Sequence, residues 1–482
     1  MMKFITLVVI LLTLSISCKE KNSANGAKNP VANRLESYIN DCNKNGLSAS
    51  ILVAQHGDIL YSGGVGFRNK TEQLPVTEAT VFTTGSLTKQ FTATAILQLQ
   101  EANKLAVSDS IYTFFDNLPK DKQHITIHQL LTHTSGIVGN LGYGVDFKPI
   151  SKQEFLAKVY NTPLDFASGT QYSYSNVGYS LLAMIIEKVT LLDYESYLQR
   201  HLFKKTGMKH TGYLLPKWDT TQVAHGYKCG EDWGTHFYKW KAATNKISWH
   251  LKGNGGILST SSDLYQWYLA VKNQKVISKK SWEQLTFPHV KENESGDSYY
   301  GYGWTLMNSD RNTKIIAHNG SNGVFYADLL QLPEENTVII YMTNELRYDT
   351  QLVAWEIEQL LFNENYTPVV PKMNPTKHID SETGNKQLQI VHQFVQLITD
   401  EDVNSDQFIT NHLTNKQRTP QFKMWIKAMQ KEFSGYSLKH ILAYEDMSYD
   451  IVLESKDGKV VDLTPCFDLQ FNEHNKLVAF GW

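Results

Sequence analysis

Cysteine is scarce in this sequence, and its spacing gives no sign of a zinc or redox centre. Four of the 482 residues are cysteines, at positions 18, 42, 229 and 466, and they match neither a CxxC pair nor a zinc-ligand spacing. An exported chain can oxidise one pair of them, and the sequence does not say which. Cysteines of this kind more often pack as small buried apolar residues.

An excess of charge of one sign is also missing. The formal net charge is −2 at pH 7, so the chain has no bulk attraction to nucleic acid or to an anionic membrane surface. We therefore expect no nucleic-acid partner. Hydrophobic residues make up 41% and charged residues 20% of the sequence, which is typical of a globular chain with a large core.

The first eighteen residues, MMKFITLVVILLTLSISC, form a predicted targeting segment. Lys3 gives a positive start, residues 4–16 are mostly apolar, and the small Ser17 precedes Cys18. The apolar stretch is too short to span a membrane comfortably.

This segment resembles a bacterial lipoprotein signal, in which the cysteine is lipidated and becomes the new N-terminus. The resemblance implies lipidation of Cys18 and a membrane anchor in the periplasm or cell envelope, with residues 19–30 as a polar tether. Ser15 stands where the usual motif prefers leucine, so ordinary secretion after cleavage is the alternative.

Periodicity predicts helices placed between an N-terminal hairpin and a later run of strands. We expect the hairpin over 47–69, helices over 87–105, 125–136, 176–190, 261–271 and 349–362, and strands over 301–307, 313–320, 323–333 and 336–344. This order predicts an α+β fold with an antiparallel sheet and an inserted helical region.

The C-terminal part predicts a small unit of its own. A proline-containing stretch follows the last helix, and we place a linker over 369–384, between a main domain (31–368) and a small α+β domain (385–482). The element order of that domain vaguely resembles the cystatin-like and NTF2-like folds. Helices are expected over 386–400 and 420–433, and strands over 436–444, 448–455, 460–471 and 476–482.

Ser86 and Lys89, in TTGSLTKQF, lie three residues apart at the start of the helix expected over 87–105. Residues at this spacing share one helix face. A serine hydroxyl becomes nucleophilic when a nearby group takes its proton, and a lysine can do so once burial lowers its pKa. On the pair alone, a capping serine with a solvated lysine is the better interpretation.

Two further sequence patterns favour a catalytic interpretation of Ser86 and Lys89. In SYSN, Tyr174 and Asn176 alternate just before an apolar helix, so a tyrosine oxygen could relay the Ser86 proton and an amide could hold Lys89. His318 and Gly320 lie at the end of an expected strand, where a glycine leaves room for the backbone to approach a ligand. Separately, these patterns fit a capped helix with a core tyrosine and a polar strand end.

The next residue, Ser321, completes the group. Its N–H and that of Ser86 could form an oxyanion hole, whose donors contribute about 3–4 kcal/mol each to catalysis.

SLTK, YSN and HNG in this order resemble the serine β-lactamase and penicillin-binding-protein superfamily, and most of all its class C branch. LLTHTSG (130–136), GNGGILSTSSDLYQW (253–267) and YGYGW (300–304) support the resemblance, which runs from about residue 31 to about 362. It implies an antiparallel sheet flanked by helices, an all-helical lobe, and a cleft between them.

The resemblance also implies roles for the residues of these motifs. Ser86 matches the acylated nucleophile, Lys89 its base and Tyr174 a base or proton relay. Asn176, His318, Gly320 and Ser321 match the residues that bind substrate or the oxyanion. The expected substrate is a small molecule or a peptidoglycan-like peptide, and no cofactor or metal is required. We expect the loop that carries His133 to be structural.

His318 departs from the family pattern, which usually has Lys-Thr-Gly at this position. A literal KTG at 205–207 follows a helix and precedes the strands, so it is in the wrong place. Histidine is mostly neutral near pH 7, so we expect weaker selection for anionic substrates and more room for esters or D-amino-acid amides. The alternative function is a catalytically weak, penicillin-binding-like sensing module.

Overall fold

A computed structural model describes most of the chain from residue 30 onward. The described residues are 30–371 without 143–144, 229–230, 244–245, 295 and 348, then 373, 378–379, 386–412 and parts of 423–481. The predicted signal segment, tether and Cys18 lie outside them, as do Cys229 and Cys466. Cys42 is a buried free thiol.

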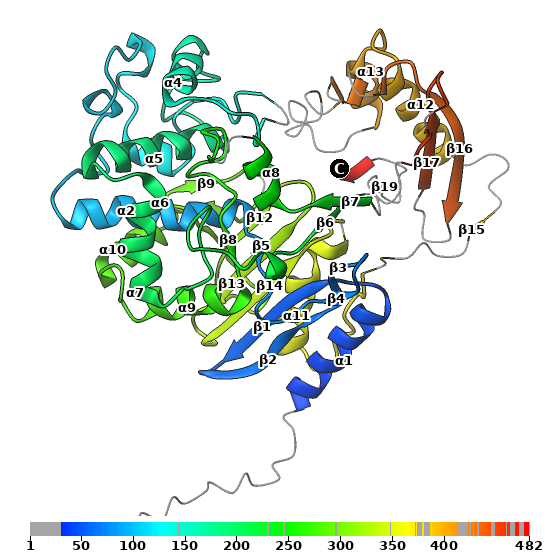
Figure 1. Ribbon diagram of the computed structural model, residues 1–482, viewed down its shortest axis with the longest axis horizontal. Coiled ribbons are helices and arrows are strands. Elements are labelled where there is room, and N and C mark those ends of the chain that lie inside the picture. The colour runs from blue at the N-terminus through cyan, green and yellow to red at the C-terminus, as the bar shows by residue number, and fades with distance from the viewer. Residues whose placement is uncertain are drawn as a thin grey trace, which may run out of the picture.

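The main sheet has eight strands in the order β2-β1-β14-β13-β12-β11-β10-β9 (Figure 1). Every neighbouring pair is antiparallel, as predicted. The strands are β1 (Ala49–Gln55), β2 (Asp58–Val65), β9 (Val290–Lys291), β10 (Tyr299–Tyr300), β11 (Thr305–Asn308), β12 (Lys314–Ser321), β13 (Tyr326–Leu332) and β14 (Thr337–Thr343).

The central strands are apolar on both faces because helices cover both sides of the sheet. In β1, Ile51 and Val53 pack into one core and Leu52 into the other, as the two-residue period of a strand requires. Helices α1 (Pro30–Lys44) and α11 (Val353–Phe362) cover the first face and contact each other. Helix α9 (Ser261–Lys272) packs on the other face. Helix α1 was not predicted from the sequence.

The larger core continues from the sheet into a helical lobe, drawn in cyan and green in Figure 1. Helix α5 begins where predicted because Ser175 caps it, with the side chain of Ser175 accepting the Gly178 N–H. The helices of this region are α2 (Thr88–Glu101), α3 (Ile127–Leu131), α4 (Lys152–Asn161), α5 (Asn176–Thr190), α6 (Tyr194–Leu198), α7 (Lys204–Thr206), α8 (His236–Ala243) and α10 (Lys279–Leu285).

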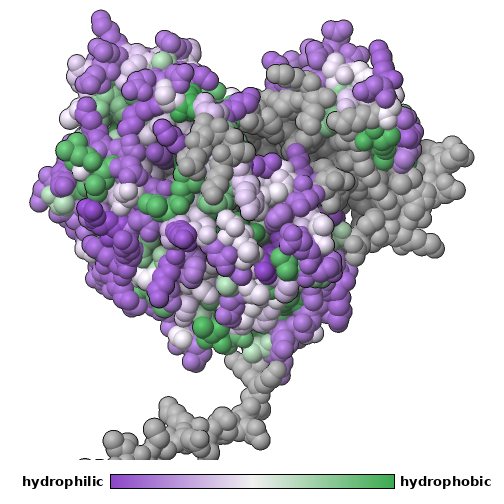
Figure 2. All heavy atoms as spheres, in the orientation of Figure 1, coloured by the Kyte–Doolittle hydropathy of each residue, from purple (hydrophilic) through white to green (hydrophobic). Residues whose placement is uncertain are grey.

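Three short strand pairs complete the main domain: β3 (Phe67–Asn69) with β4 (Leu74–Pro75), β5 (Phe82–Thr83) with β8 (Leu258–Ser259), and β6 (Gly226–Lys228) with β7 (Glu231–Gly234). Hydrophilic side chains cover most of the face shown in Figure 2, and apolar ones form small separate groups on it. Within the described part of the chain, no helix has both the length and the apolarity needed to cross a membrane.

The C-terminal residues form a separate hydrophobic core. Its elements are α12 (Lys386–Thr399), α13 (Ser405–His412), a sheet of β15 (His378–Ile379), β16 (Ser437–Tyr444), β17 (Tyr449–Glu454) and β18 (Val460–Asp462), and the pair β19 (Asp468–Phe471) and β20 (Leu477–Gly481).

Three details of this part differ from the sequence predictions. β15 lies inside the predicted linker, where pairing with β16 stabilises two residues that have no strand pattern of their own. The strand predicted over 460–471 is two strands, β18 and β19. Helix α13 was not predicted, and much of the helix predicted over 420–433 lies outside the described residues.

The end of β12 touches the short 3-10 helix η1 (Gly85–Leu87), which leads into α2. A Cβ atom on Gly320 would lie 2.0 Å from the Thr84 carbonyl oxygen and 2.6 Å from the Ser86 nitrogen. A Cβ on Gly85, whose φ is +50°, would lie 2.5 Å from the Ser321 nitrogen. The two backbones can approach this closely only because both positions are glycine.

We predict that Gly320→Ala forces these backbones apart. Overpacking of this kind costs about 1–3 kcal/mol of stability, and displacement of a backbone N–H from an oxyanion site costs about 10²–10³ in rate. Thermal unfolding and the rate of labelling by a fluorophosphonate serine probe measure the two effects. Gly63→Ala is the matched control, because its Cβ would meet only the end of the Tyr61 side chain, at 3.3 Å. Labelling of Gly320→Ala at the wild-type rate would contradict the prediction.

Candidate active site

Ser86 is the accessible member of an otherwise buried helix start. It lies in η1, and the residues from Phe82 to Leu97 are buried except for Ser86, which is partly exposed. The carbonyl oxygen of Gly85 accepts hydrogen bonds from the Thr88 side chain and backbone, which fixes the turn. Ser86 is therefore a partly exposed residue on a turn that hydrogen bonds hold.

Lys89 lies directly behind Ser86 and is fully buried. Its Nζ is 3.1 Å from Ser86 Oγ, 2.7 Å from Asn176 Oδ1 and 2.7 Å from the Asn254 carbonyl oxygen. Burial lowers the pKa of Lys89 well below the usual lysine value, and the nearby Asp146 opposes part of that shift. A neutral amine at this position is therefore favoured.

Three oxygen atoms surround Nζ within hydrogen-bonding distance. The Asn254 carbonyl can only accept a hydrogen bond, and Asn176 presents its Oδ1, so these two atoms use both N–H groups of an uncharged amine. In the structure Nζ donates the third hydrogen bond, to Ser86 Oγ. In the neutral amine a lone pair replaces this N–H and can accept the Ser86 proton. The arrangement can therefore take a proton from Ser86.

Two asparagines fix these acceptors. Asn176 donates from Nδ2 to Asn140 Oδ1 at 3.0 Å, which leaves its own Oδ1 turned to Lys89. Asn254 donates from Nδ2 to Ser180 Oγ and to the His250 carbonyl, which holds the backbone that supplies the third acceptor.

Tyr174 lies two residues before α5, and its side chain contacts both Ser86 and Lys89. Lys89 Nζ lies 4.6 Å from the centroid of its ring. Burial raises the pKa of the Tyr174 hydroxyl, and its hydrogen bond with Ser86 opposes the rise. The phenol is therefore protonated at rest and is placed to exchange a proton with Ser86.

His318 is buried and neutral. Its Nδ1 lies 2.6 Å from the Asn319 carbonyl oxygen, to which it donates, so its Nε2 accepts from Tyr300 Oη at 2.9 Å. Burial lowers the pKa of His318 to about 3, and Lys89 adds to the lowering. His318 therefore offers no positive charge to a substrate at neutral pH.

The structure brings together all seven residues that the motifs predicted in the main domain. Ser86, Lys89, Tyr174 and Asn176 share hydrogen bonds, and Gly320 and Ser321 meet η1. His318 joins them through ring contact with Tyr174, at 6.3 Å between centroids. The KTG at 205–207 lies at the end of α7, with Gly207 in a left-handed conformation, and not on a strand of the main sheet.

Sequence reasoning missed Asn140, Asn254 and Tyr300. The signal for Asn254 was its place in the glycine-rich GNGG, and that for Tyr300 was YGYGW. Asn140 has no comparable signal. Among the described residues, no cluster of three or more His, Cys, Asp or Glu side chains could hold a metal ion.

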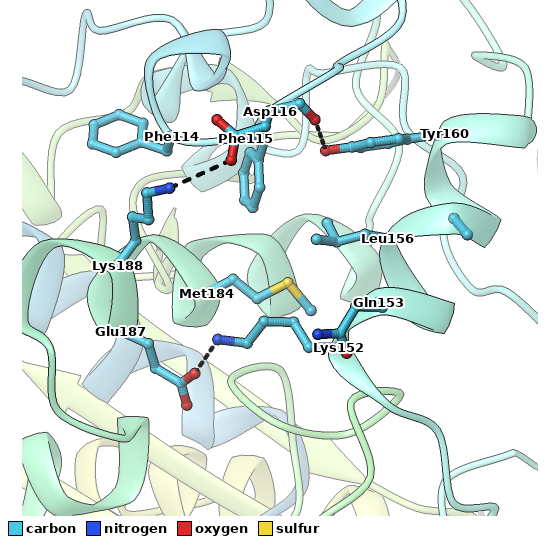
Figure 3. A pocket seen from close by; sticks show the side chains of 11 residues that line it. Phe114, Phe115, Asp116, Lys152, Gln153, Leu156, Tyr160, Met184, Glu187 and Lys188 are labelled. Atoms are coloured by element: carbon cyan, nitrogen blue, oxygen red, sulfur yellow. Dashed lines mark hydrogen bonds and ion pairs between the residues drawn. The ribbon is translucent and has the colours of Figure 1, made fainter.

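Two cavities lie in the helical lobe, away from these residues. One, of about 410 Å³, opens between α4 and α5 (Figure 3). Its charged groups are already paired, Lys152 with Glu187 at 2.5 Å and Lys188 with Asp116 at 3.8 Å. The other, of about 540 Å³, shares Lys152 and extends to Trp249. No predicted site residue lines either cavity, so neither is the candidate active site.

Comparisons with a family model and with curated proteins assign the chain to the same family. The Beta-lactamase family model matches residues 35–361. Penicillin-binding protein 4* of Bacillus subtilis (strain 168) is 29% identical over 355 residues, which cover 70% of this chain and 78% of that protein.

Solved structures with a similar fold support the same assignment. An octameric penicillin-binding protein homologue from Pyrococcus abyssi has a TM-score of 0.60 and 27% identity, and the match covers 68% of this chain and 77% of that one. A class C β-lactamase has a TM-score of 0.60 at 24% identity, covering 72% of this chain and 99% of that one, and so shares the fold. The predicted resemblance and fold are confirmed: the chain belongs to the β-lactamase family and is a serine hydrolase of that family.

Proposed function

We propose that the protein is an exported hydrolase that forms an acyl-enzyme at Ser86 and cleaves an ester, an amide or a D-amino-acid peptide bond. The single observation that carries the proposal is the fully buried Lys89 amine, hydrogen-bonded to Ser86 Oγ and to two acceptors that use its N–H groups. The predicted N-terminal targeting segment supports export.

In the proposed reaction, Ser86 Oγ attacks the substrate carbonyl while its proton passes to the neutral Lys89 amine. The backbone N–H groups of Ser86 and Ser321 hold the developing oxyanion. Tyr174 relays the proton to the leaving group, whose bond to the carbonyl carbon breaks to give the Ser86 ester. Water then attacks this ester, giving up a proton to the same groups, and releases the acid and free Ser86.

The charges around the site favour a substrate without a carboxylate near the scissile bond. The position that is usually lysine in the superfamily is the neutral His318. Glu292 accepts a hydrogen bond from Tyr172 at 3.0 Å and acts electrostatically on Tyr174, and Asp146 acts on Lys89. These carboxylates repel an anionic group and tolerate neutral or cationic ones, which supports esters and D-amino-acid amides.

The nucleophile assignment is tested by labelling. A fluorophosphonate probe is expected to label the wild type and Ser62→Ala, a control on the edge strand β2, but not Ser86→Ala. Equal labelling of Ser86→Ala would refute the assignment. Mass spectrometry of substrate-treated enzyme distinguishes the alternative: an adduct on Ser86 that never hydrolyses would indicate a sensing module.

The substrate preference is tested with nitrocefin, an acyl-D-Ala-D-Ala peptide and a short-chain nitrophenyl ester. We expect the ester to have the highest kcat/KM, and His318→Lys to raise kcat/KM for the two carboxylate-bearing substrates relative to the ester. His56→Lys, which adds the same charge at the β1–β2 turn, is the control. A wild-type preference for nitrocefin by orders of magnitude would contradict the account.

The protonation state of Lys89 is tested by Asn176→Asp. A carboxylate 2.7 Å from Nζ stabilises the ammonium form and raises the pKa of Lys89 by about 1–3 units. Only the amine can accept the Ser86 proton, so the acid limb of the pH–rate profile moves to higher pH by the same amount. The loss of activity at neutral pH is then recovered as the pH rises. Asn103→Asp, at the exposed end of α2, should leave the profile in place. An unmoved profile for Asn176→Asp would contradict the role of Lys89.

A further inference from the structure

His133 has an unusual backbone for a buried residue. It lies between α3 and the loop to residue 140, with 1% of its surface exposed and a φ of +60°. Non-glycine residues seldom adopt this left-handed region, and its occupation marks positions where another requirement outweighs backbone strain. The sequence predicts a structural loop here, and the contacts of His133 show what that loop holds.

These contacts surround Tyr174. The His133 carbonyl accepts the Ser173 N–H at 2.9 Å, and the ring atom Nδ1 accepts the Ser175 N–H at 3.0 Å. The ring itself lies 4.2 Å from the Tyr174 ring, centroid to centroid, with 37° between the planes. His133 therefore holds the chain on both sides of Tyr174 and also contacts its side chain.

The side chain of His133 is not fully satisfied by these contacts. Because Nδ1 accepts, the neutral imidazole carries its proton on Nε2. That buried N–H has no hydrogen-bond partner among the described residues. Aromatic rings are close, with centroids of Tyr300 and Tyr179 at 4.6 Å and 5.1 Å. A buried N–H without an acceptor is destabilising, so both backbone and side chain of His133 carry a penalty beside Tyr174.

The hydrogen bond from the Ser175 N–H requires an unprotonated Nδ1 on His133. A proton on Nδ1 would remove the acceptor of the Ser175 N–H and place a cation near Lys89. Burial lowers the pKa of His133 well below the usual value, and Lys89 and His318 add to the lowering. The lowered pKa keeps the imidazole neutral near pH 7, so Nδ1 remains an acceptor.

We propose that His133 is a positioning residue that sets where the Tyr174 hydroxyl lies relative to Ser86. Its ring is the surface against which the Tyr174 ring rests, and its Nδ1 fixes the backbone that carries that ring. This inference rests on the proposed role of Tyr174 as proton relay. His133 itself touches neither Ser86 nor the substrate in this account.

His133→Asn is the test variant. Asparagine adopts the same left-handed φ at Asn103, Asn117 and Asn336 of this protein, and its short amide oxygen can accept the Ser175 N–H, so the main change is loss of the ring. We expect the fluorophosphonate labelling rate to fall by about 10- to 100-fold, as for a misplaced catalytic group. His56→Asn is the matched control, because His56 has a φ of +53° at the β1–β2 turn; it should label at the wild-type rate.

Double-mutant comparison with Tyr174→Phe separates positioning from a general structural effect. If His133 acts through the Tyr174 hydroxyl, His133→Asn causes no further loss in the Tyr174→Phe background. Each variant is assayed well below its own unfolding midpoint. Should His133→Asn not fold, His133→Gln replaces it, since Gln73 and Gln274 share this backbone conformation.

The outcomes are distinguishable. Loss of labelling in Tyr174→Phe but labelling of the His133 variant within twofold of wild type would overturn this inference alone. A full additional loss in the double variant would also overturn it, because the effect would then not pass through Tyr174. Wild-type labelling of Tyr174→Phe would remove the proposed relay, and the inference with it.

Discussion

The enclosure of one amine, the Lys89 Nζ, is the constraint on which the rest of the site depends. A buried ammonium is strongly disfavoured, and the two obligatory acceptors around Nζ, Asn176 Oδ1 and the Asn254 carbonyl, match the two N–H groups of a neutral amine. In the neutral form, the lone pair takes the place of the N–H that donates to Ser86 Oγ. In the proposed mechanism, this environment makes Lys89 the base that takes the Ser86 proton.

The fold creates this enclosure by close backbone approach at glycines. Gly303 has a φ of +74°, and a Cβ there would lie 2.8 Å from the Lys89 carbonyl oxygen. Gly253 brings the Asn254 backbone against α5, where a Cβ would lie 2.5 Å from the Ala183 side chain. Gly320 brings the end of β12 to Ser86. The segments that carry Gly253, Gly303 and Gly320 therefore pack against the first turn of α2. The Tyr174 ring lies against Lys89 on the remaining side.

Sequence reasoning identified the residues of the three motifs better than the residues that hold them in place. Ser86, Lys89 and Tyr174 stand in motifs whose spacing can be read directly, and the start of α5 was placed correctly because Ser175 is a recognisable cap. Asn254 accepts the Lys89 hydrogen bond with its backbone carbonyl, a group that every residue type has. It lies 165 positions from Lys89 in the sequence, so no local pattern links the two. Asn140 was missed because its role depends on a partner in another element, Asn176. His133 was assigned to a structural loop, and its contacts around Tyr174 could not be predicted from the sequence. Helix α1 has its buried Leu35, Tyr38, Ile39 and Cys42 at helical spacing, so its signal was present in the sequence and overlooked.

The central claim, that Lys89 is a neutral amine in the resting enzyme, can be measured directly by following lysine Nζ chemical shifts against pH in ¹⁵N-lysine-labelled protein. Lys89→Arg identifies the signal, since arginine lacks that label and leaves the other lysines in place. The account predicts that the Lys89 signal titrates well below the lysine value of about 10.4, and in the same range as the acid limb of Ser86 labelling. A Lys89 signal that titrates with the surface lysines would contradict it.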